Sequence, residues 1–556
     1  MQQKFLEKTL GQQIADMAAK YPDDNMIDYT DRDYSRTWKE FNDECETIAR
    51  GFMALGLKKG SHISIWGTNV PAWLLTFFGS AKMGGILVTV NTSYKVFELD
   101  YQLKQSDSEA IVLIDGYKGT SYIDIINELC PELESCEPGK LKSRRLPLLK
   151  SVIYAGEGEC PAGMVDWKKL YTLAEQTPVE EFEAVRDSCD CHEVVNIQYT
   201  SGTTGFPKGV MLTHYNILNN GQTIGDGMKF THEDRLCITV PFFHCFGMVL
   251  ALMSCISHGT PFVPIDMFNA KKVMDALATK HCTAVHGVPT MFIAMLEHPD
   301  FDKYDFSHMR TGIMAGSPCP IKTMYDVSEK MNMRDIVIVF GQTEAAPGCT
   351  MTTTEDSLET RCATVGKAFP GVECKIVDPN TGETLPAGEI GEFCARGYNI
   401  MKGYYKMPEA TAQAIDKDGW LHFGDLAVCD ENGYYKVTGR LKDMIIRGGE
   451  NIYPKELEEC LYHNDRVKDV QVIGVPSKKY GEEVCACVIL KEGEDMTEDE
   501  IKAYYKENVA FFKIPKYVWI MDEFPMTASG KIQKFVLRDM AVEKYSLQSD
   551  DSIETA

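Results

Sequence analysis

The segment from Tyr199 to Val210 carries the clearest chemical pattern in the sequence. It reads YTSGTTGFPKGV and combines hydroxyl side chains, glycines and one lysine. These residues are Thr200, Ser201, Gly202, Thr203, Thr204, Gly205, Lys208 and Gly209. The glycines let the backbone adopt positive φ and approach a ligand closely. So many donors on a strand-to-helix turn fit a triphosphate, and we predict that this loop binds nucleotide phosphates.

The residue order differs from that of a Walker A loop, in which lysine follows the last glycine and precedes Ser or Thr. Here Lys208 precedes Gly209, and Pro207 precedes the lysine. By composition alone, the segment is also typical of a plain flexible loop. The kinases and GTPases that depend on Walker A are therefore excluded.

The order T-S-G-T-T-G-x-P-K-G resembles the phosphate loop of the AMP-forming adenylate superfamily. That superfamily includes acyl-CoA synthetases, adenylation domains of peptide synthetases, and luciferases. Four further segments resemble its motifs in its order: FGQTE at 340–344, GWLHFGD at 419–425, GRLKD at 439–443 and TASGK at 527–531. The C-terminal segments are most similar to CoA ligases of the medium-chain fatty acid type.

The resemblance implies a reaction in two halves. A carboxylate attacks the α-phosphorus of ATP to give acyl-AMP and diphosphate, and the thiol of CoA then displaces AMP. The first half brings two anions together, so the site needs cationic charge and a metal. By resemblance, Lys531 would reach the carboxylate and the α-phosphate, whereas composition alone favours an exposed turn lysine. Glu344 and Thr200 would hold Mg²⁺, which prefers hard oxygen ligands.

The resemblance also implies the nucleotide contacts. Phe340 takes the place of an aromatic residue, more often Tyr, that stacks on adenine; otherwise it ends the core of a strand. Asp425 would accept hydrogen bonds from the ribose hydroxyls. Phe423 stands where the family often has Thr, so a hydroxyl contact from that position is in doubt. Further nucleotide contacts are implied for Gly316, Ser317, Gly341, Gln342, Thr343 and Arg440.

Lys442 matches the family's hinge, about which the C-terminal domain rotates between the two halves. In the second pose, the segment 447–451 would face the site. Its implied CoA contacts are Arg447, Gly448, Gly449 and Glu450, although a plain β-turn explains the glycine pair nearly as well. His244, in PFFHCFG at 241–247, would contact the carboxylate or gate the thiol channel, and is otherwise a core histidine.

Short apolar runs alternate with helical patterns and predict an α/β fold with largely parallel sheets. Thr37 and Glu40 form a capping-box pattern that opens a helix. Apolar strands are expected at 62–66, 86–90, 110–114, 194–199, 236–240, 260–265 and 335–340. The segment 130–149 is expected to be a surface excursion.

The pattern of predicted helices and strands changes near residue 440. A helix at 454–461, strands at 470–475 and 484–490, and a helix at 497–508 predict a small α+β domain. We therefore expect an ATP- and acyl-binding domain at 1–440, a mobile C-terminal domain at 441–546 and a disordered tail at 547–556.

The bulk composition limits the partners. A net charge of −24 over 556 residues argues against non-specific binding to nucleic acid or anionic membranes. The 19 cysteines show no C-x-x-C spacing, which is typical of reduced thiols in a cytosolic protein. Cys189, Cys191 and His192 could bind a metal, but a polar loop is the commoner explanation. No signal peptide or membrane-spanning segment is recognised, so we expect a cytoplasmic protein.

The sequence specifies the acid substrate less well than it specifies the adenylation reaction. The apolar residues around His244, without an obvious charged partner for an amino group, favour an acyl or aryl acid over an amino acid. We expect a fatty acid, ATP and CoA as substrates. An aryl-acid CoA ligase, a free-standing enzyme that loads a carrier protein, and a catalytically silent nucleotide-binding protein remain as alternatives. The acyl chain length and the oligomeric state are not specified.

Overall fold

The computed structural model divides into two compact units. One comprises Met1–Cys374 and Ala395–Leu421, and the other Lys375–Cys394 and His422–Ala556. The residues that the structure describes are 4–200, 207–316, 319–447, 450–477, 479–509, 511–527 and 531–547, without the side chains of Glu450 and Asn451.

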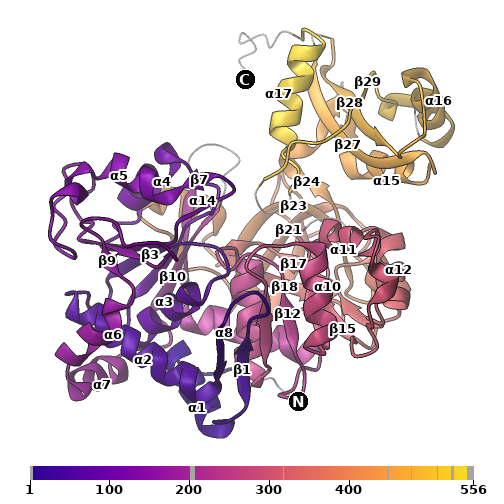
Figure 1. Ribbon diagram of the computed structural model, residues 1–556. Coiled ribbons are helices and arrows are strands. Elements are labelled where there is room, and N and C mark those ends of the chain that lie inside the picture. The colour runs from indigo at the N-terminus through magenta and orange to yellow at the C-terminus, as the bar shows by residue number, and fades with distance from the viewer. Residues whose placement is uncertain are drawn as a thin grey trace. The chain divides into compact units, whose positions relative to one another are not determined.

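An eight-stranded sheet, mostly parallel, forms one half of the first unit (Figure 1). In spatial order its strands are β22 (Gly403–Tyr404), β11 (Lys208–Thr213), β10 (Val194–Thr200), β4 (Ile86–Thr89), β3 (His62–Trp66), β5 (Ala110–Leu113), β8 (Ser151–Tyr154) and β9 (Val165–Asp166). Its helices include α2 (Trp38–Ala54), α3 (Pro71–Lys82), α4 (Val96–Gln105) and α5 (Tyr122–Leu129). The capping box of Thr37 and Glu40 opens α2 as predicted.

A seven-stranded sheet forms the other half. In spatial order its strands are β16 (Asp335–Val337), β15 (Thr311–Ile313), β14 (Ala284–His286), β12 (Leu236–Ile238), β13 (Phe262–Pro264), β1 (Asn25–Asp28) and β2 (Ser35–Thr37). All its strand pairs except β1–β2 are parallel. Helices α10 (Ala270–Thr279), α11 (Pro289–Leu296) and α12 (Ile321–Lys330) follow its strands, and α8 (His214–Gly227) is largely buried. The predicted α/β class is confirmed.

The predicted strand at 335–340 is two strands. β16 ends at Val337, and β17 (Val339–Gly341) pairs antiparallel with β18 (Gly348–Met351) in a separate sheet. The backbone N–H of Ile338, between them, donates instead to Oγ1 of Thr352 at 2.9 Å. Both strands are buried and give one continuous apolar run, so the sequence does not show where one strand ends and the next begins.

The second unit is built on two sheets. The first contains β20 (Val372–Val377), β21 (Gly391–Gly397), β23 (Leu421–Cys429) and β24 (Tyr435–Arg440) in that order. The second contains β26 (Glu450–Ile452), β25 (Ile445–Arg447), β28 (Gly481–Leu490) and β27 (Val467–Ser477), with β29 (Tyr517–Ile520) also paired to β28. Its helices are α15 (Pro454–Tyr462), α16 (Glu498–Asn508) and α17 (Lys534–Lys544), so the predicted α+β elements are confirmed.

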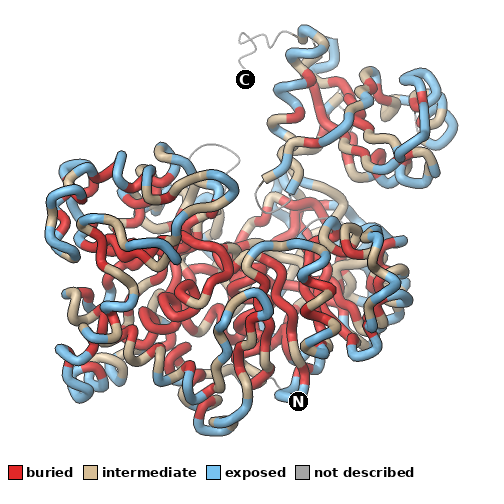
Figure 2. Tube along the Cα trace, in the orientation of Figure 1, coloured by how far each residue is buried: buried red, intermediate tan, exposed pale blue. Residues whose placement is uncertain are grey.

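Burial follows the strands (Figure 2). In β28, Val484, Ala486 and Val488 pack into one core while Cys485 and Cys487 pack into the other, as the two-residue period of a strand requires. All 19 cysteines are free thiols. Within the described ranges, no helix is both long and apolar enough to cross a membrane. Of the predicted tail, Leu547 packs against the second core, and residues 548–556 lie outside the described part of the chain.

Candidate active site

The predicted phosphate loop joins two antiparallel strands. Thr200 ends β10 and pairs with Lys208, the first residue of β11, while residues 201–206 lie outside the described ranges. The expected strand-to-helix turn is therefore wrong. The helix begins only at His214, because Thr213 and Asn216 form a reciprocal capping box there. Predictions for Ser201, Gly202, Thr203, Thr204 and Gly205 concern residues that the structure does not describe.

Gly209 has a role different from the predicted one. It is not among the glycines with positive φ. A Cβ atom at this position would lie 2.8 Å from Cγ2 of Ile197 and 3.2 Å from Cζ of Tyr199. The glycine thus allows the two strands of the hairpin to pack closely. The hydroxyl of Tyr101 donates to the carbonyl of Pro207 at 3.1 Å, so α4 supports the end of the loop.

Lys208, Tyr404 and Glu344 lie together in the first unit. The Nζ atom of Lys208 is 4.9 Å from the ring centroid of Tyr404, and the Tyr404 hydroxyl donates to Oε1 of Glu344 at 2.9 Å. Tyr404 is in β22, the neighbour of β11. Burial raises the pKa of Tyr404, and the nearby charge of Glu344 raises it further. Tyr404 is therefore a protonated donor at neutral pH.

Glu344 and Thr343 are buried in the 3₁₀ turn η5 (Thr343–Ala345). The turn follows Gly341, where a Cβ atom would lie 1.8 Å from the carbonyl oxygen of Pro347. Only glycine fits this close backbone approach. The preceding Phe340 is half-buried in β17, and Gln342 caps the turn. The motif at 340–344 is thus a strand end followed by a tight turn that presents a carboxylate and a hydroxyl.

His244 lies beside this turn. The thiol of Cys245 is 3.4 Å from Oγ1 of Thr343, and Nδ1 of His244 accepts the backbone N–H of Phe246 at 3.1 Å. Because Nδ1 is an acceptor, we assign the ring proton to Nε2, which makes that nitrogen a donor. The π-helix η3 (Phe246–Met253) follows directly, and all its residues are buried.

The segment before Gly316, one of the implied nucleotide contacts, adjoins Gly287. The backbone N–H of Ala315 donates to the carbonyl of Gly287 at 3.3 Å. Gly316 has a φ of 90°, which favours glycine, and Ser317 lies outside the described residues. Next to them, burial lowers the pKa of His286 to about 4, so this histidine is neutral.

Asp425 and Arg440 are cross-strand partners in the second unit. They face each other in β23 and β24, and Nε of Arg440 donates to Oδ1 of Asp425 at 3.0 Å. Burial raises the pKa of the Asp425 carboxyl despite the opposing charges of Arg440 and Lys531. The pairing explains how a buried carboxylate is tolerated here, since a buried charge needs a partner.

Lys442 lies in the 3₁₀ turn η6 (Leu441–Asp443), directly after β24. Burial and the neighbouring charge of Arg440 lower its pKa. Lys531 is exposed and makes two hydrogen bonds with Thr527: the Lys531 N–H donates to Oγ1 at 3.0 Å, and the Thr527 N–H donates to the Lys531 carbonyl at 2.7 Å.

Arg447 is held by contacts within the second unit. Its Nε atom lies 2.7 Å from Oε2 of the buried Glu483, and Nη1 donates to the carbonyl of Phe512 at 2.8 Å. Arg447 and Glu450 are cross-strand neighbours in β25 and β26. Gly448, Gly449 and the side chain of Glu450 lie outside the described part of the structure.

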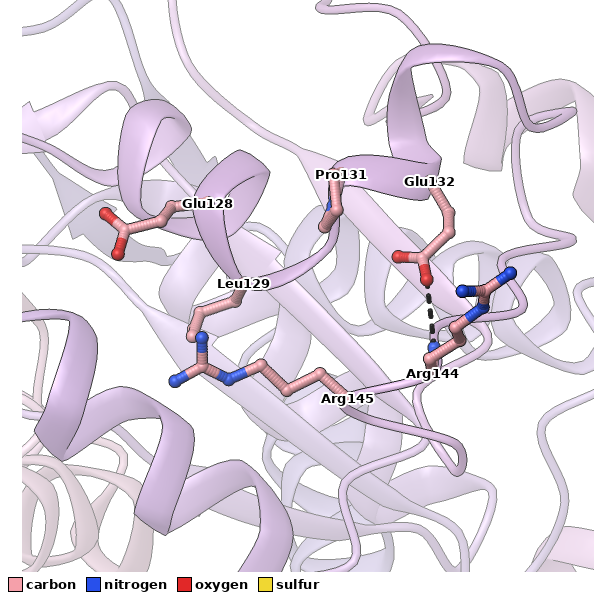
Figure 3. Close-up of a pocket in the computed structure, with 6 residues that line it drawn as sticks. All are labelled: Glu128, Leu129, Pro131, Glu132, Arg144 and Arg145. Carbon is pink, nitrogen blue, oxygen red and sulfur yellow. Dashed lines mark hydrogen bonds between the residues drawn. The ribbon is translucent and has the colours of Figure 1, made fainter.

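A surface pocket of about 510 Å³ contains none of the predicted site residues (Figure 3). It is lined by Glu128, Leu129, Pro131, Glu132, Arg144 and Arg145. Arg145 pairs with Asp100 at 2.9 Å, and Oε1 of Glu132 accepts the backbone N–H of Arg144 at 3.0 Å. Arg145 is thus tied to α4, outside the surface excursion predicted at 130–149, whereas Glu132 binds within that segment.

Two residues of the site region were not predicted from the sequence: Tyr404, which contacts Glu344, and Glu392, which contacts the motif at 419–425. The short segments GYYK at 403–406 and GE at 391–392 were visible, but no local pattern shows which motif they touch. For the metal, the buried carboxylate of Glu344 and the hydroxyl of Thr200 supply the oxygen donors that suit Mg²⁺.

These features define a nucleotide-binding α/β enzyme whose motif residues are distributed over two units. The family model described as AMP-binding enzyme matches residues 14–405, and the AMP-binding enzyme C-terminal domain matches residues 456–531. The chain therefore belongs to the AMP-binding enzyme family. It is an AMP-forming acyl-CoA synthetase of that family, and the family's reaction uses ATP, Mg²⁺ and CoA.

Similar proteins agree with this assignment. The Bacillus subtilis (strain 168) protein named "Putative acyl-CoA synthetase YngI" is 51% identical over 98% of this chain and 99% of its own length. The Homo sapiens mitochondrial medium-chain acyl-CoA ligase ACSF2 is 39% identical over 96% of this chain and 87% of its own length. The ATP-bound crystal structure of MatB from Rhodopseudomonas palustris has a TM-score of 0.83 at 28% identity, over 97% of this chain and 100% of MatB.

Proposed function

We propose that the protein activates a fatty acid, converting acid, ATP and CoA into acyl-CoA, AMP and diphosphate through an acyl-adenylate. The observation that carries the choice of acid is the apolar helix η3, which begins two residues after His244. Every residue of η3 is buried, and its sequence FGMVLALM contains no charged or hydrogen-bonding side chain. Apolar surroundings of this kind next to the proposed carboxylate contact favour an apolar acyl group, because burial of apolar surface stabilises binding. The relatives named as medium-chain acyl-CoA ligases support the same choice.

In the first half-reaction, cationic groups offset the repulsion between the carboxylate and the triphosphate. Lys208 supplies charge beside the loop at 200–208, and Lys531 bridges the carboxylate and the α-phosphate. Glu344 and Thr200 would hold Mg²⁺, which neutralises phosphate charge when bound. His244 donates from Nε2 to the carboxylate. Thr343 contacts the α-phosphate.

The nucleoside is held by aromatic, polar and charged residues of the motifs. Phe340 stacks on adenine next to Gly316 and Ser317, and Asp425 accepts hydrogen bonds from the ribose, assisted by Arg440. Gly341 and Gln342 shape the turn that presents Glu344. The loop residues Ser201, Gly202, Thr203, Thr204 and Gly205 complete the phosphate contacts.

The second half-reaction uses a different pose of the C-terminal domain. Residues 1–440 bind ATP and the acid, and residues 441–546 rotate about Lys442. Rotation withdraws Lys531 and brings the CoA contacts Arg447, Gly448, Gly449 and Glu450 to the site. We also assign the protein to the cytoplasm, which its 19 free thiols support.

A screen of diphosphate release over acids of graded chain length tests this function. We expect release that depends on acid and Mg²⁺ to peak with a saturated fatty acid, and AMP to accumulate when CoA is added. A peak with benzoate-like acids would favour an aryl-acid ligase. Release without CoA turnover would favour a carrier-loading enzyme. Formation of ADP, or no adenylation with any acid, would contradict the proposal.

A further inference from the structure

Glu392 connects β21 to the motif that carries Asp425. This carboxylate is 8% exposed. Its Oε1 atom accepts the backbone N–H of Gly424 at 3.0 Å, and its Oε2 atom accepts Nδ1–H of His422 at 2.8 Å. Both oxygens therefore hold the segment directly before Asp425.

The Gly424 contact meets a local requirement of the backbone. Gly424 has a φ of 66°, although no heavy atom lies within 4 Å of the position of a Cβ atom. Glycine is thus required by the left-handed conformation and not by space. Gly424 lies within β23 and is not exposed, so its backbone N–H needs an acceptor, and Glu392 supplies it. The ring of Phe423 packs on that of Phe393 at 4.8 Å between centroids and adds apolar packing next to Gly424.

Three potential metal ligands meet here, because the thiol of Cys394 lies 3.5 Å from Nδ1 of His422. A metal ion would have to break the hydrogen bond between His422 and Glu392. It would also compete with Gly424 for the carboxylate. The hydrogen-bonded arrangement satisfies these groups without an ion, so we base no metal site on them.

We propose that Glu392, oriented by His422, is a positioning residue that holds β23 at Gly424 so that Asp425 meets the ribose hydroxyls of ATP. This inference rests on the proposed role of Asp425. Loss of the Glu392 carboxylate leaves the Gly424 N–H without this acceptor and loosens β23 next to Asp425. The effect reaches the ribose through Asp425 alone, so it appears as a loss of discrimination between nucleotides that have and lack a ribose hydroxyl.

The test compares kcat/KM for ATP with that for 2′-deoxy-ATP and 3′-deoxy-ATP in acid-dependent diphosphate release by the full chain. We expect the preference for ATP to disappear in Asp425→Ala. In Glu392→Ala we expect it to fall at least fivefold, mainly through KM for ATP. Glu392→Gln should retain most of the preference because its amide oxygen can still accept the Gly424 N–H. Glu373, an exposed carboxylate paired with Arg396, provides the matched control, and Glu373→Ala should behave as wild type.

The outcomes distinguish a failure of the proposed Asp425 role from a failure of the Glu392 positioning role. If Asp425→Ala keeps the wild-type preference, the proposed role of Asp425 fails. If Asp425→Ala loses the preference while Glu392→Ala keeps it, the positioning role is overturned and the proposed function stands. His422→Ala is a second variant for the case in which Glu392→Ala does not fold, since the side chain of His422 is 31% exposed. In His422→Ala we expect a smaller loss of the preference for ATP than in Glu392→Ala. An unchanged preference in a folded His422→Ala protein would overturn the positioning role.

Discussion

The hydroxyl of Tyr404 donates a hydrogen bond of 2.9 Å to Oε1 of Glu344, and Nζ of Lys208 lies 4.9 Å from the centroid of the same ring. One tyrosine thus contacts both the proposed metal ligand and the lysine of the phosphate loop. It is contributed by β22, which pairs with β11. The sheet therefore holds Tyr404 next to Lys208, and the tyrosine in turn contacts Glu344 through its hydroxyl.

Replacing Tyr404 with Phe should raise the Mg²⁺ concentration needed for half-maximal adenylation about tenfold. A hydrogen bond to a charged group contributes about 1.5–3 kcal/mol, and its loss frees the Glu344 carboxylate to rotate. Diphosphate release measured against Mg²⁺ at saturating ATP tests the kinetic effect. Titration of Mn²⁺, followed by electron paramagnetic resonance with ATP present, tests the affinity directly.

Tyr405→Phe is the matched control for this variant. The Tyr405 hydroxyl donates to Oδ2 of Asp107 at 2.9 Å, a carboxylate outside the proposed site. We expect the Mg²⁺ dependence of Tyr405→Phe to equal that of the wild type. Equal shifts in both variants would show a general loss of stability instead of a role at Glu344.

Lys531→Ala should lower the rate of acyl-adenylate formation much more than the rate of thioester formation from supplied acyl-AMP. In the proposed mechanism the lysine offsets anionic repulsion only in the first half-reaction, and removing one preorganised charge typically costs a factor of about 100–1,000. The two half-reactions are measured separately by diphosphate release and by CoA consumption. Equal losses in both halves would contradict the two-pose model.

Lys442→Pro should selectively impair one half-reaction. Proline fixes φ near −65° and removes the backbone N–H, so residue 442 can no longer change conformation in η6. The same comparison of half-reactions provides the measurement. A uniform decrease in both halves would place the hinge elsewhere.

Arg440→Gln should move the acidic limb of the pH profile of kcat/KM for ATP to higher pH. Burial already raises the pKa of Asp425, and the charge of Arg440 opposes that rise. Without the guanidinium the pKa of Asp425 rises further. As the pH falls, Asp425 is then protonated at a higher pH than in the wild type and no longer offers the ribose a carboxylate. Arg396→Gln, which removes a surface pair with Glu373, should leave the limb in place.

His214 should make the first unit less stable at mildly acidic pH. Burial lowers its pKa to about 4 from 6.5, and its Nδ1 atom accepts the backbone N–H of Leu10 at 3.1 Å. Between these values the unfolded chain binds more protons, so the free energy of unfolding falls by about 2 kcal/mol from pH 7 to pH 5. Urea unfolding at the two pH values should show a smaller fall in His214→Gln. The exposed His308→Gln is the control, and equal pH dependence in both variants would contradict this account.

Elements that depend on neighbouring residues could be predicted from the sequence. The capping boxes of Thr37 with Glu40 and of Thr497 with Glu500 mark the starts of α2 and α16, because both partners lie within one helical turn. The phosphate loop was assigned to the wrong connection because its own residues do not show where the following helix begins. That signal lies further on, in Thr213 and Asn216.

Contacts between distant segments could not be predicted. Tyr404 is 60 residues from Glu344, and Glu392 is 32 residues from Gly424. Glu392 and Gly424 meet because β21 and β23 are neighbours in a sheet, whereas Tyr404 reaches from β22 to the 3₁₀ turn that carries Glu344. A motif identifies the residue that touches a ligand, while the residue that orients it carries no local pattern of its own.

The ion pair of Arg440 with Asp425 has a thermodynamic consequence. Arg440 ends β24, and the turn with the proposed hinge Lys442 begins at the next residue. A nucleotide that draws Arg440 away from Asp425 therefore changes the conformational preference of the backbone at the hinge. Linkage is reciprocal, so each hinge conformation must alter nucleotide affinity by the same factor by which nucleotide alters the hinge equilibrium. Release of AMP and return of the domain to its first pose would then be one coupled equilibrium.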